Sequence, residues 1–202
     1  HYRAKEKNCR IIAYECFDLL NRIDPPWYKK YIWELGIFLN LKTFKIFKSF
    51  GTDNFLKPNF SKKNINNATK ISTNFFKKNT TLEKLENFKI NEVWIGDLIY
   101  DSYLKKYQVG TIDLNSFKFK KFFFECIKLF NFWFDFFNKN KVEAIAGCHA
   151  VYLTGIPLRI ANKKDINCFA ISSIHCDLVN LKGSISFQKK INGADIQYTY
   201  FK

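Results

Sequence analysis

The chain has 202 residues, of which 47% are hydrophobic, and it carries a formal net charge of +15. This length suffices for one sizeable core, and the ordinary apolar content disfavours an intrinsically disordered chain. The charge favours anionic partners, namely nucleic acid, anionic lipid or phosphorylated small molecules, although a solvated surface produced by AT-rich coding would give the same excess of Lys.

The first elements predict a parallel crossover. Residues 9–17 (CRIIAYECF) are mostly apolar, which indicates a buried strand. A helix follows, with Asp24 as N-cap and a proline at its first position. Residues 44–51 (FKIFKSFG) alternate as a second strand that ends at Gly51. On one face of the helix lie six large apolar side chains, which are Tyr28, Tyr31, Ile32, Leu35, Phe38 and Leu39.

The middle of the chain divides into a basic stretch and a set of capped helices. Residues 57–80 are rich in Asn and Lys with weak periodicity, so we expect irregular structure with one helix near 67–78. A short helix capped by Thr80 or Thr81 comes next, then an extended segment at 92–95 and a helix over 97–107. Ser116 is a plausible cap for a long helix whose wide apolar face indicates a core helix packed on a sheet.

The last part of the chain predicts a βαβ unit. Residues 142–148 form a strand, a helix from residue 150 is reset by Pro157 and ends near Lys164, and 166–171 form the next strand. The tail after Val179 indicates short strands or a hairpin. The fold class is therefore α/β, with a Rossmann-like parallel sheet flanked by helices over residues 1–180, and 181–202 begin a following segment or a terminal hairpin.

The first residue, the cysteines and the charges of the sequence indicate the cellular compartment that we expect for this protein. It begins at His1 and contains no Met, which predicts a fragment of a longer protein. None of the six cysteines forms a C-x-x-C pair, a pattern typical of buried thiols in a reducing compartment. The most apolar segment, 117–137, is too highly charged for the centre of a bilayer, and no signal peptide is visible. We therefore expect a cytoplasmic protein.

Polar side chains follow both strands of the βαβ unit. Because ligands of open parallel sheets bind beyond the carboxyl ends of the strands, this edge is a candidate site. His149 comes directly after the first strand, and Tyr152 lies three residues further on. An imidazole there could act as a base or bind phosphate, which we favour for His149 over a role as a helix cap, whereas for His175 we favour the structural role. The residues that follow the second strand at the same edge are Ser172, Ser173 and His175.

A second candidate cluster opens the helix over 97–107. Asp97 and Asp101 are four residues apart, and like charges at this spacing repel each other. Asp97 as a cap and Asp101 paired with Lys105 would explain them without a ligand. However, Gly96 allows a close backbone approach, and Tyr100 lies beside the pair.

Several common sites have no signature in the sequence. It contains no G-x-G-x-x-G, P-loop, G-x-S-x-G or H-E-x-x-H motif, which disfavours dinucleotide, NTPase, serine hydrolase and zincin chemistry. Only the positive net charge supports nucleic-acid binding, because no known binding module is recognisable in the sequence. Cys148–His149 and His175–Cys176 have no zinc-ligand spacing, so we expect no metal.

Three segments in this order, 47–56 (FKSFGTDNFL), 95–107 (IGDLIYDSYLKKY) and 148–172 (CHAVYLTGIPLRIANKKDINCFAIS), resemble bacterial surface-carbohydrate biosynthesis proteins. These are similar to the capsule-polysaccharide class of GT-B-like glycosyltransferases. The resemblance implies the N-terminal, acceptor-side lobe of a two-lobed enzyme. A second lobe beyond Lys202 would bind the nucleotide-sugar donor, and this domain itself would hold no cofactor.

The resemblance also implies roles and partners. His149 would be the base or the phosphate contact, Asp97 and Asp101 would orient acceptor hydroxyls or the loop of His149, and Tyr100 and Tyr152 would line the cleft. The acceptor would be a glycan or a lipid-linked molecule, and the basic stretch would give peripheral contact with an anionic inner membrane. The alternative is a non-catalytic domain that binds an anionic glycan or lipid head group through the Lys-rich region 41–90.

Overall fold

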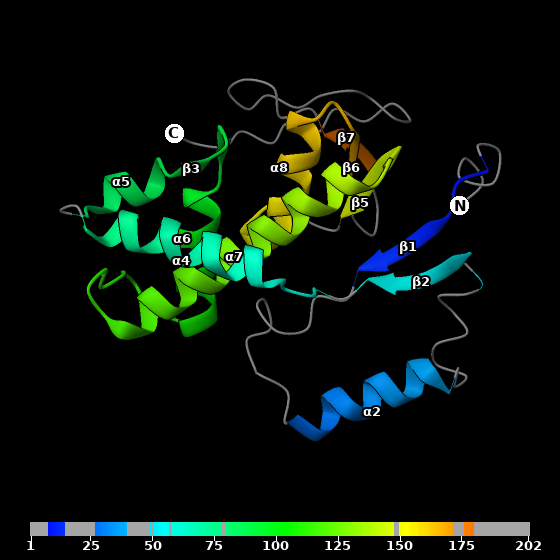
Figure 1. Cartoon of the computed structure of the whole chain (residues 1–202), viewed down its shortest axis with the longest axis horizontal. Helices are drawn as coiled ribbons and strands as arrows, with labels where there is room; N and C mark the ends of the chain where they lie inside the picture. The colour runs from blue at the N-terminus through cyan, green and yellow to red at the C-terminus, as the bar shows by residue number, and fades with distance from the viewer. Residues whose placement is uncertain are drawn as a thin grey trace. The chain divides into compact units, whose positions relative to one another are not determined.

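The computed structural model (Figure 1) describes residues 8–14, 27–39, 49, 51–56, 58–77, 80–147, 150–171 and 176–179. The chain divides into two compact units, 1–59 and 60–202, which are described separately below. The predicted boundary near residue 180 lies outside the described residues. The described part is mixed α/β, with helices and short strands in three small sheets.

The first unit contains the predicted parallel crossover. β1 (Ile11–Tyr14) pairs in parallel with β2 (Thr52–Leu56), and α2 (Trp27–Phe38) lies between them in sequence. The position predicted for the second strand is wrong, because β2 begins after Gly51 and does not end there. Gly51 has a φ of 76°, a left-handed conformation that belongs to a turn and not to a strand. Of the predicted strand, 44–48 and residue 50 lie outside the described residues.

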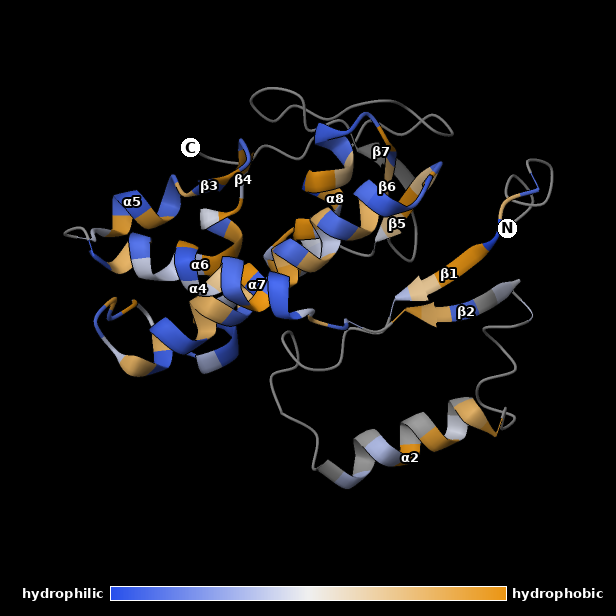
Figure 2. Ribbon diagram, viewed as in Figure 1, coloured by the Kyte–Doolittle hydropathy of each residue, from blue (hydrophilic) through white to orange (hydrophobic). Residues whose placement is uncertain are grey.

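The apolar face predicted for α2 forms, but it is exposed. Exposed fractions run from 47% for Tyr28 to 83% for Phe38. Orange segments along α2 in Figure 2 mark apolar residues of this helix. Gly36, on another side of the helix, is buried. Asp24 and the proline after it, predicted to start the helix, lie outside the described residues.

In the second unit, the stretch expected to be mostly irregular forms a long helix. α4 spans Lys62–Lys77 and begins earlier than the predicted 67–78, because the Ser61 hydroxyl accepts a hydrogen bond from the Asn64 amide at 3.2 Å. Asn64, Ala68 and Ser72 are buried on one side of α4. Asn131 of the long helix α7 (Phe117–Lys139) donates to the Asn64 carbonyl and accepts from the Asn67 amide, both at 3.1 Å. Tertiary contact therefore stabilises a helix whose sequence has weak helical propensity.

A short capped helix and a hairpin follow α4. Thr81 caps α5 (Leu82–Glu86), as predicted, by accepting from the Lys84 amide at 3.3 Å. β3 (Lys89–Ile90) and β4 (Val93–Trp94) are antiparallel. Asn91 and Glu92 between them have φ values of 49° and 62°, which is the backbone of a two-residue hairpin turn. Of the extended segment predicted at 92–95, only Val93–Trp94 form a strand, because Glu92 lies in the turn and Ile95 is the N-cap of the next helix.

The predicted long helix is the centre of the core. Ser116 caps α7 by accepting from the Phe119 amide at 3.2 Å, and Phe119, Phe123 and Phe130 are fully buried. α7 packs mainly against helices α4 and α8 (Gly155–Lys163), where we expected a sheet. No helix in the described part of the chain has the length and apolarity needed to cross a membrane.

The βαβ unit forms where it was predicted. β5 (Ala144–Gly147) pairs in parallel with β6 (Asn167–Ile171), and a 3-10 turn, η1 (Tyr152–Thr154), and α8 connect them. β7 (Cys176–Val179) then pairs with β6 in the antiparallel direction. Gly147 is paired with Ala170, so the carboxyl ends of β5 and β6 lie at the same edge of this sheet.

Candidate functional site

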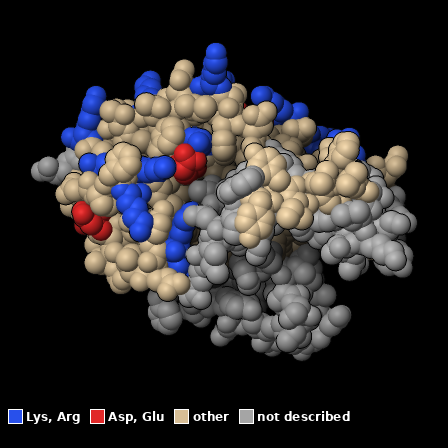
Figure 3. Space-filling view, turned by 90° about the horizontal axis from the view of Figure 1, so that it is seen from below, with Lys and Arg blue, Asp and Glu red and all other residues tan. Residues whose placement is uncertain are grey.

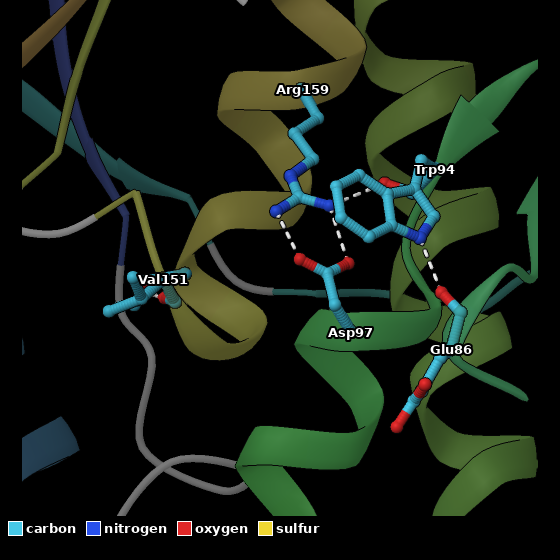
Figure 4. Close-up of polar contacts among 6 residues, drawn as sticks. Glu86, Trp94, Asp97, Val151 and Arg159 are labelled. Atoms are coloured by element: carbon cyan, nitrogen blue, oxygen red, sulfur yellow. Dashed lines mark hydrogen bonds and ion pairs between the residues drawn. The ribbon is translucent and has the colours of Figure 1, made fainter. Parts of the chain in front are cut away.

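An ion pair joins the start of α6 (Gly96–Tyr107) to α8 (Figure 4). Both terminal guanidinium nitrogens of Arg159, Nη1 and Nη2, donate to the carboxylate of Asp97, each at 2.6 Å. The side chains are only 16% and 26% exposed. This paired, planar geometry is the strong form of an arginine–carboxylate contact, and it fixes the direction as well as the distance of both groups.

The arginine also holds the β3–β4 hairpin. Its Nη1 donates to the Trp94 carbonyl at 2.9 Å, and its guanidinium carbon lies 4.8 Å from the centre of the Trp94 ring. The Trp94 indole N–H donates in turn to the Glu86 carbonyl (Figure 4). Hairpin, α6 and α8 are therefore connected through one side chain.

Asp97 and Asp101 do not have the structural roles considered from the sequence, which were a helix cap for Asp97 and an ion pair with Lys105 for Asp101. The N-cap of α6 is Ile95, so Asp97 lies inside the first turn, where the helix dipole favours its charge, and it is not the predicted cap. Within the described residues, no salt bridge joins Asp101 to Lys105. The Lys105 ammonium lies instead 3.8 Å from the centre of the Tyr152 ring.

Asp101 lies one turn after Asp97 on α6. Partial burial of its carboxyl raises the pKa of Asp101 above its usual value, and the nearby Asp97 charge raises it further, while Arg159 acts in the opposite direction. The Asp101 residue as a whole is nonetheless exposed to solvent. A carboxylate with a raised pKa that solvent can reach is suited to accept a proton from a hydroxyl group.

Gly96 allows a close backbone approach, as its sequence position suggested. The backbone that approaches it belongs to residues 85–88 of the same chain. A Cβ at this position would lie 1.8 Å from the Leu85 carbonyl oxygen and 2.8 Å from the Phe88 nitrogen. The Gly96 amide donates to the Phe88 carbonyl at 3.0 Å. Gly96 thus lets the start of α6 pack against the end of α5, and this packing places Asp97 in front of Arg159.

The two tyrosines predicted to line a cleft have different surroundings. Tyr152 has a φ of 56°, which is uncommon for a bulky residue, and η1 packs against α6 around it. The Thr154 hydroxyl donates to the Val151 carbonyl at 2.7 Å and closes this turn. Tyr100 is partly exposed, whereas Tyr103 in the same helix is buried against Phe119.

α6 and the η1–α8 segment thus gather five polar or aromatic side chains, which we call the α6–α8 cluster: Asp97, Asp101, Lys105, Tyr152 and Arg159. It contains both carboxylates singled out in the sequence and one of the two tyrosines. His149, Ser172, Ser173 and His175 lie outside the described residues, as do the side chains of the cysteines beside the two histidines. In the described part of the chain, no group of three or more His, Cys, Asp or Glu could hold a metal ion.

Arg159 was not predicted as a site residue, although a signal for it exists. The sequence has 33 basic residues, and only four of them are arginines. An arginine in a helix that is otherwise largely apolar stands out against that background, since Lys cannot replace its forked geometry. Its partner Asp97 is 62 residues away in sequence, so the pair itself could not be predicted from spacing.

Comparison of the chain with protein-family models, with curated proteins and with solved structures gave no match.

Proposed function

We propose that this chain is the Rossmann-like, acceptor-side lobe of a glycosyltransferase-like enzyme of surface-polysaccharide assembly. The whole enzyme would transfer a sugar from a nucleotide-sugar to a glycan or a lipid-linked acceptor. The supporting observation is the Asp97–Arg159 ion pair, because it joins the two segments, 96–104 and 149–166, that carry most of the resemblance. Two motifs that act at one site need such a connection.

The contacts of Asp97 and Asp101 support a different role for each. Both carboxylate oxygens of Asp97 accept from Arg159, so Asp97 is a positioning residue that holds α8 and the turn before it against α6. Asp101 has no such partner among the described residues and faces solvent. It is therefore the carboxylate that would contact an acceptor hydroxyl, with Tyr100 and Tyr152 beside it.

The proposed reaction needs one proton acceptor. The acceptor hydroxyl oxygen forms a bond to the anomeric carbon of the donor sugar, the bond from that carbon to the nucleotide phosphate breaks, and the hydroxyl proton passes to a base. His149 or Asp101 would take this proton. A cationic His149 would instead stabilise the departing phosphate, so the two residues define two distinguishable roles.

The test is turnover of nucleotide-sugars by the intact protein. We would incubate the whole enzyme, donor lobe included, with UDP-, GDP-, dTDP- and CMP-linked sugars and with a cell-envelope glycolipid extract as acceptor, and measure the release of the nucleotide. With the productive donor, His149→Ala and Asp101→Asn should each lower kcat about 100-fold, because general acid–base groups contribute about that factor. Far-UV circular dichroism should show that both variants remain folded.

Asp113→Asn is the matched control. Asp113 is an exposed aspartate before α7, and its Oδ1 accepts a hydrogen bond from the Asn115 amide that an asparagine can also accept. This variant should keep full turnover. Normal turnover in both His149→Ala and Asp101→Asn would reject the proposed site, and no turnover of any donor by the unmodified protein would reject the enzyme.

A further inference from the structure

A separate cleft lies between the second half of α4 and the α5–β3 segment. It is shallow and largely open to solvent, with a volume of about 420 Å³. Two asparagines, two phenylalanines and two lysines make up most of its lining: Asn74, Phe75, Lys84, Asn87, Phe88 and Lys89. None of these residues belongs to the α6–α8 cluster.

The aromatic part of the cleft is rigid. Phe75 stacks on the fully buried Phe123, with ring centres 4.5 Å apart and planes at 18°. Phe88 lies 4.9 Å from Phe75 and 5.2 Å from Phe123. Both cleft rings are partly exposed, so they present fixed apolar surface to a ligand without ordering new side chains.

The polar part carries amides and positive charge. The Asn87 side-chain amide donates to the Glu83 carbonyl at 2.9 Å, which holds this side chain in place at the end of α5. An asparagine offers both a donor and an acceptor, as paired hydroxyl groups require. Lys84 and Lys89 are exposed, and none of the described residues that line the cleft is acidic. On the face drawn in Figure 3, basic side chains also outnumber acidic ones.

We infer that this cleft binds an acidic saccharide, meaning a sugar chain that carries carboxylate or phosphate groups. The apolar C–H faces of sugar rings pack on aromatic side chains, hydroxyls pair with amides, and the acidic groups are attracted by the two lysines. A nucleobase fits less well, because the Phe75 and Phe88 rings stand at 69° to each other and form no flat slot.

The inference does not depend on the proposed transferase activity. A binding cleft of this kind would hold an acidic polysaccharide whether or not the α6–α8 cluster performs chemistry. Loss of turnover in Asp101→Asn leaves the cleft intact, and loss of cleft binding leaves the cluster intact. The two proposals can therefore fail separately.

The experiment is an NMR titration of the ¹⁵N-labelled chain. The probes are tetragalacturonic acid, the uncharged maltotetraose, glucose phosphate and uridine monophosphate. We expect tetragalacturonic acid to shift the backbone amide resonances of residues 84–89 and to bind more tightly than maltotetraose. Its binding should weaken with added salt. Glucose phosphate shows whether a phosphate can replace the carboxylates.

Charge-neutral variants test the lysines. Lys84→Gln/Lys89→Gln should weaken binding of tetragalacturonic acid about fivefold, because two exposed ion pairs are lost. The matched control is Lys62→Gln/Lys63→Gln, which removes the same charge from two exposed lysines at the other end of α4. It should leave the affinity within about twofold, since these charges lie beyond the screening distance.

Three outcomes would overturn the inference. They are equal binding of maltotetraose and tetragalacturonic acid, equal loss of affinity in the two lysine variants, and amide shifts that lie outside the cleft. Tighter binding of uridine monophosphate at residues 84–89 would replace the saccharide by a nucleotide. Thermal unfolding of each variant shows whether a loss of binding reflects a loss of fold.

Discussion

Arg159 connects three elements whose sequences lie far apart. It forms two hydrogen bonds with Asp97, one with the Trp94 carbonyl, and a stacking contact with the Trp94 ring. Each contact is partly shielded from water, so its strength is not lost to solvent as it is for an exposed ion pair. The position therefore depends on the shape of the guanidinium group as much as on its charge.

Replacement of Arg159 should reveal this dependence. Arg159→Ala should lower the free energy of unfolding by about 2 kcal/mol, because Asp97 is left partly buried without its partner. Arg159→Lys should lose most of that amount, since an ammonium group cannot form the fork. Urea denaturation of these variants and of Asp97→Ala, combined as a double-mutant cycle, measures the coupling.

The control is an exposed ion pair on the same helix. Lys163 of α8 contacts Glu92 at 2.7 Å, and its side chain is 51% exposed. Lys163→Ala should leave the midpoint of urea unfolding unchanged. Additive effects of Asp97→Ala and Arg159→Ala would contradict the role assigned to the fork.

Asp101 gives a prediction about pH. Burial and the Asp97 charge raise the pKa of Asp101 in the folded state above its ordinary value of 3.8. The folded protein therefore holds this proton more tightly than the unfolded chain does, and stability falls as the pH rises from the unfolded value through the folded one. Above the folded pKa the full penalty of the charge is present.

Asp101→Asn removes that penalty. The variant should unfold at a higher urea concentration than the original protein at neutral pH, and this advantage should shrink toward zero as the pH falls to about 4. Equilibrium urea unfolding followed by circular dichroism at several pH values checks it. An advantage that grew on acidification would mean that the charge of Asp101 stabilises the fold.

At the scale of elements, the helices with recognisable caps were predicted well, whereas the predicted helix at 67–78 misses the first turn and a half of α4. The apolar faces over 97–107 and 117–139 repeat with helical spacing, and Ser116 and Thr81 are recognisable caps. α4 is composed largely of Asn, Lys and Thr, and its buried positions are Asn64, Ala68 and Ser72. The first half of α4 therefore packs through small and polar residues, whereas Phe75 and Phe76 near its end pack on Phe123, so the apolar signal lies in the later part of the helix.

The contrast between α2 and α7 can be tested with one substitution. Phe38 of α2 is 83% exposed, and Phe130 of α7 is fully buried. Phe38→Ala should change the free energy of unfolding by less than about 0.5 kcal/mol, because little buried surface is lost. Phe130→Ala should lower it by about 3–5 kcal/mol through the lost contacts and the cavity.

Urea unfolding of both variants provides the comparison, and the identical chemical change makes each variant the control for the other. A large loss of stability in Phe38→Ala would show that the apolar stripe of α2 is covered in solution. In that case the apolar face of α2 would be buried in solution, as its sequence pattern predicts.

For the whole molecule, the described core belongs to the second unit. Every buried hydrophobic residue of the described chain lies between Ala68 and Cys168, and the aromatic cluster around Phe123 is its centre. No lysine or arginine whose exposure the structure describes is buried, so the positive charge of this part of the chain lies at its surface. One chain thus combines an aromatic interior with a basic exterior that suits anionic ligands.

Local patterns in the sequence predict several elements correctly. These are the capped helices at 82–86 and 117–139, the helix at 96–107, and the parallel βαβ unit over 144–171, because caps, periodicity and crossover handedness act over short distances. Other features depend on tertiary contacts. The full length of α4, the partner of Asp97 and the cleft beside Phe75 and Phe88 depend on contacts between residues far apart in sequence, and no local pattern encodes which distant side chains will meet.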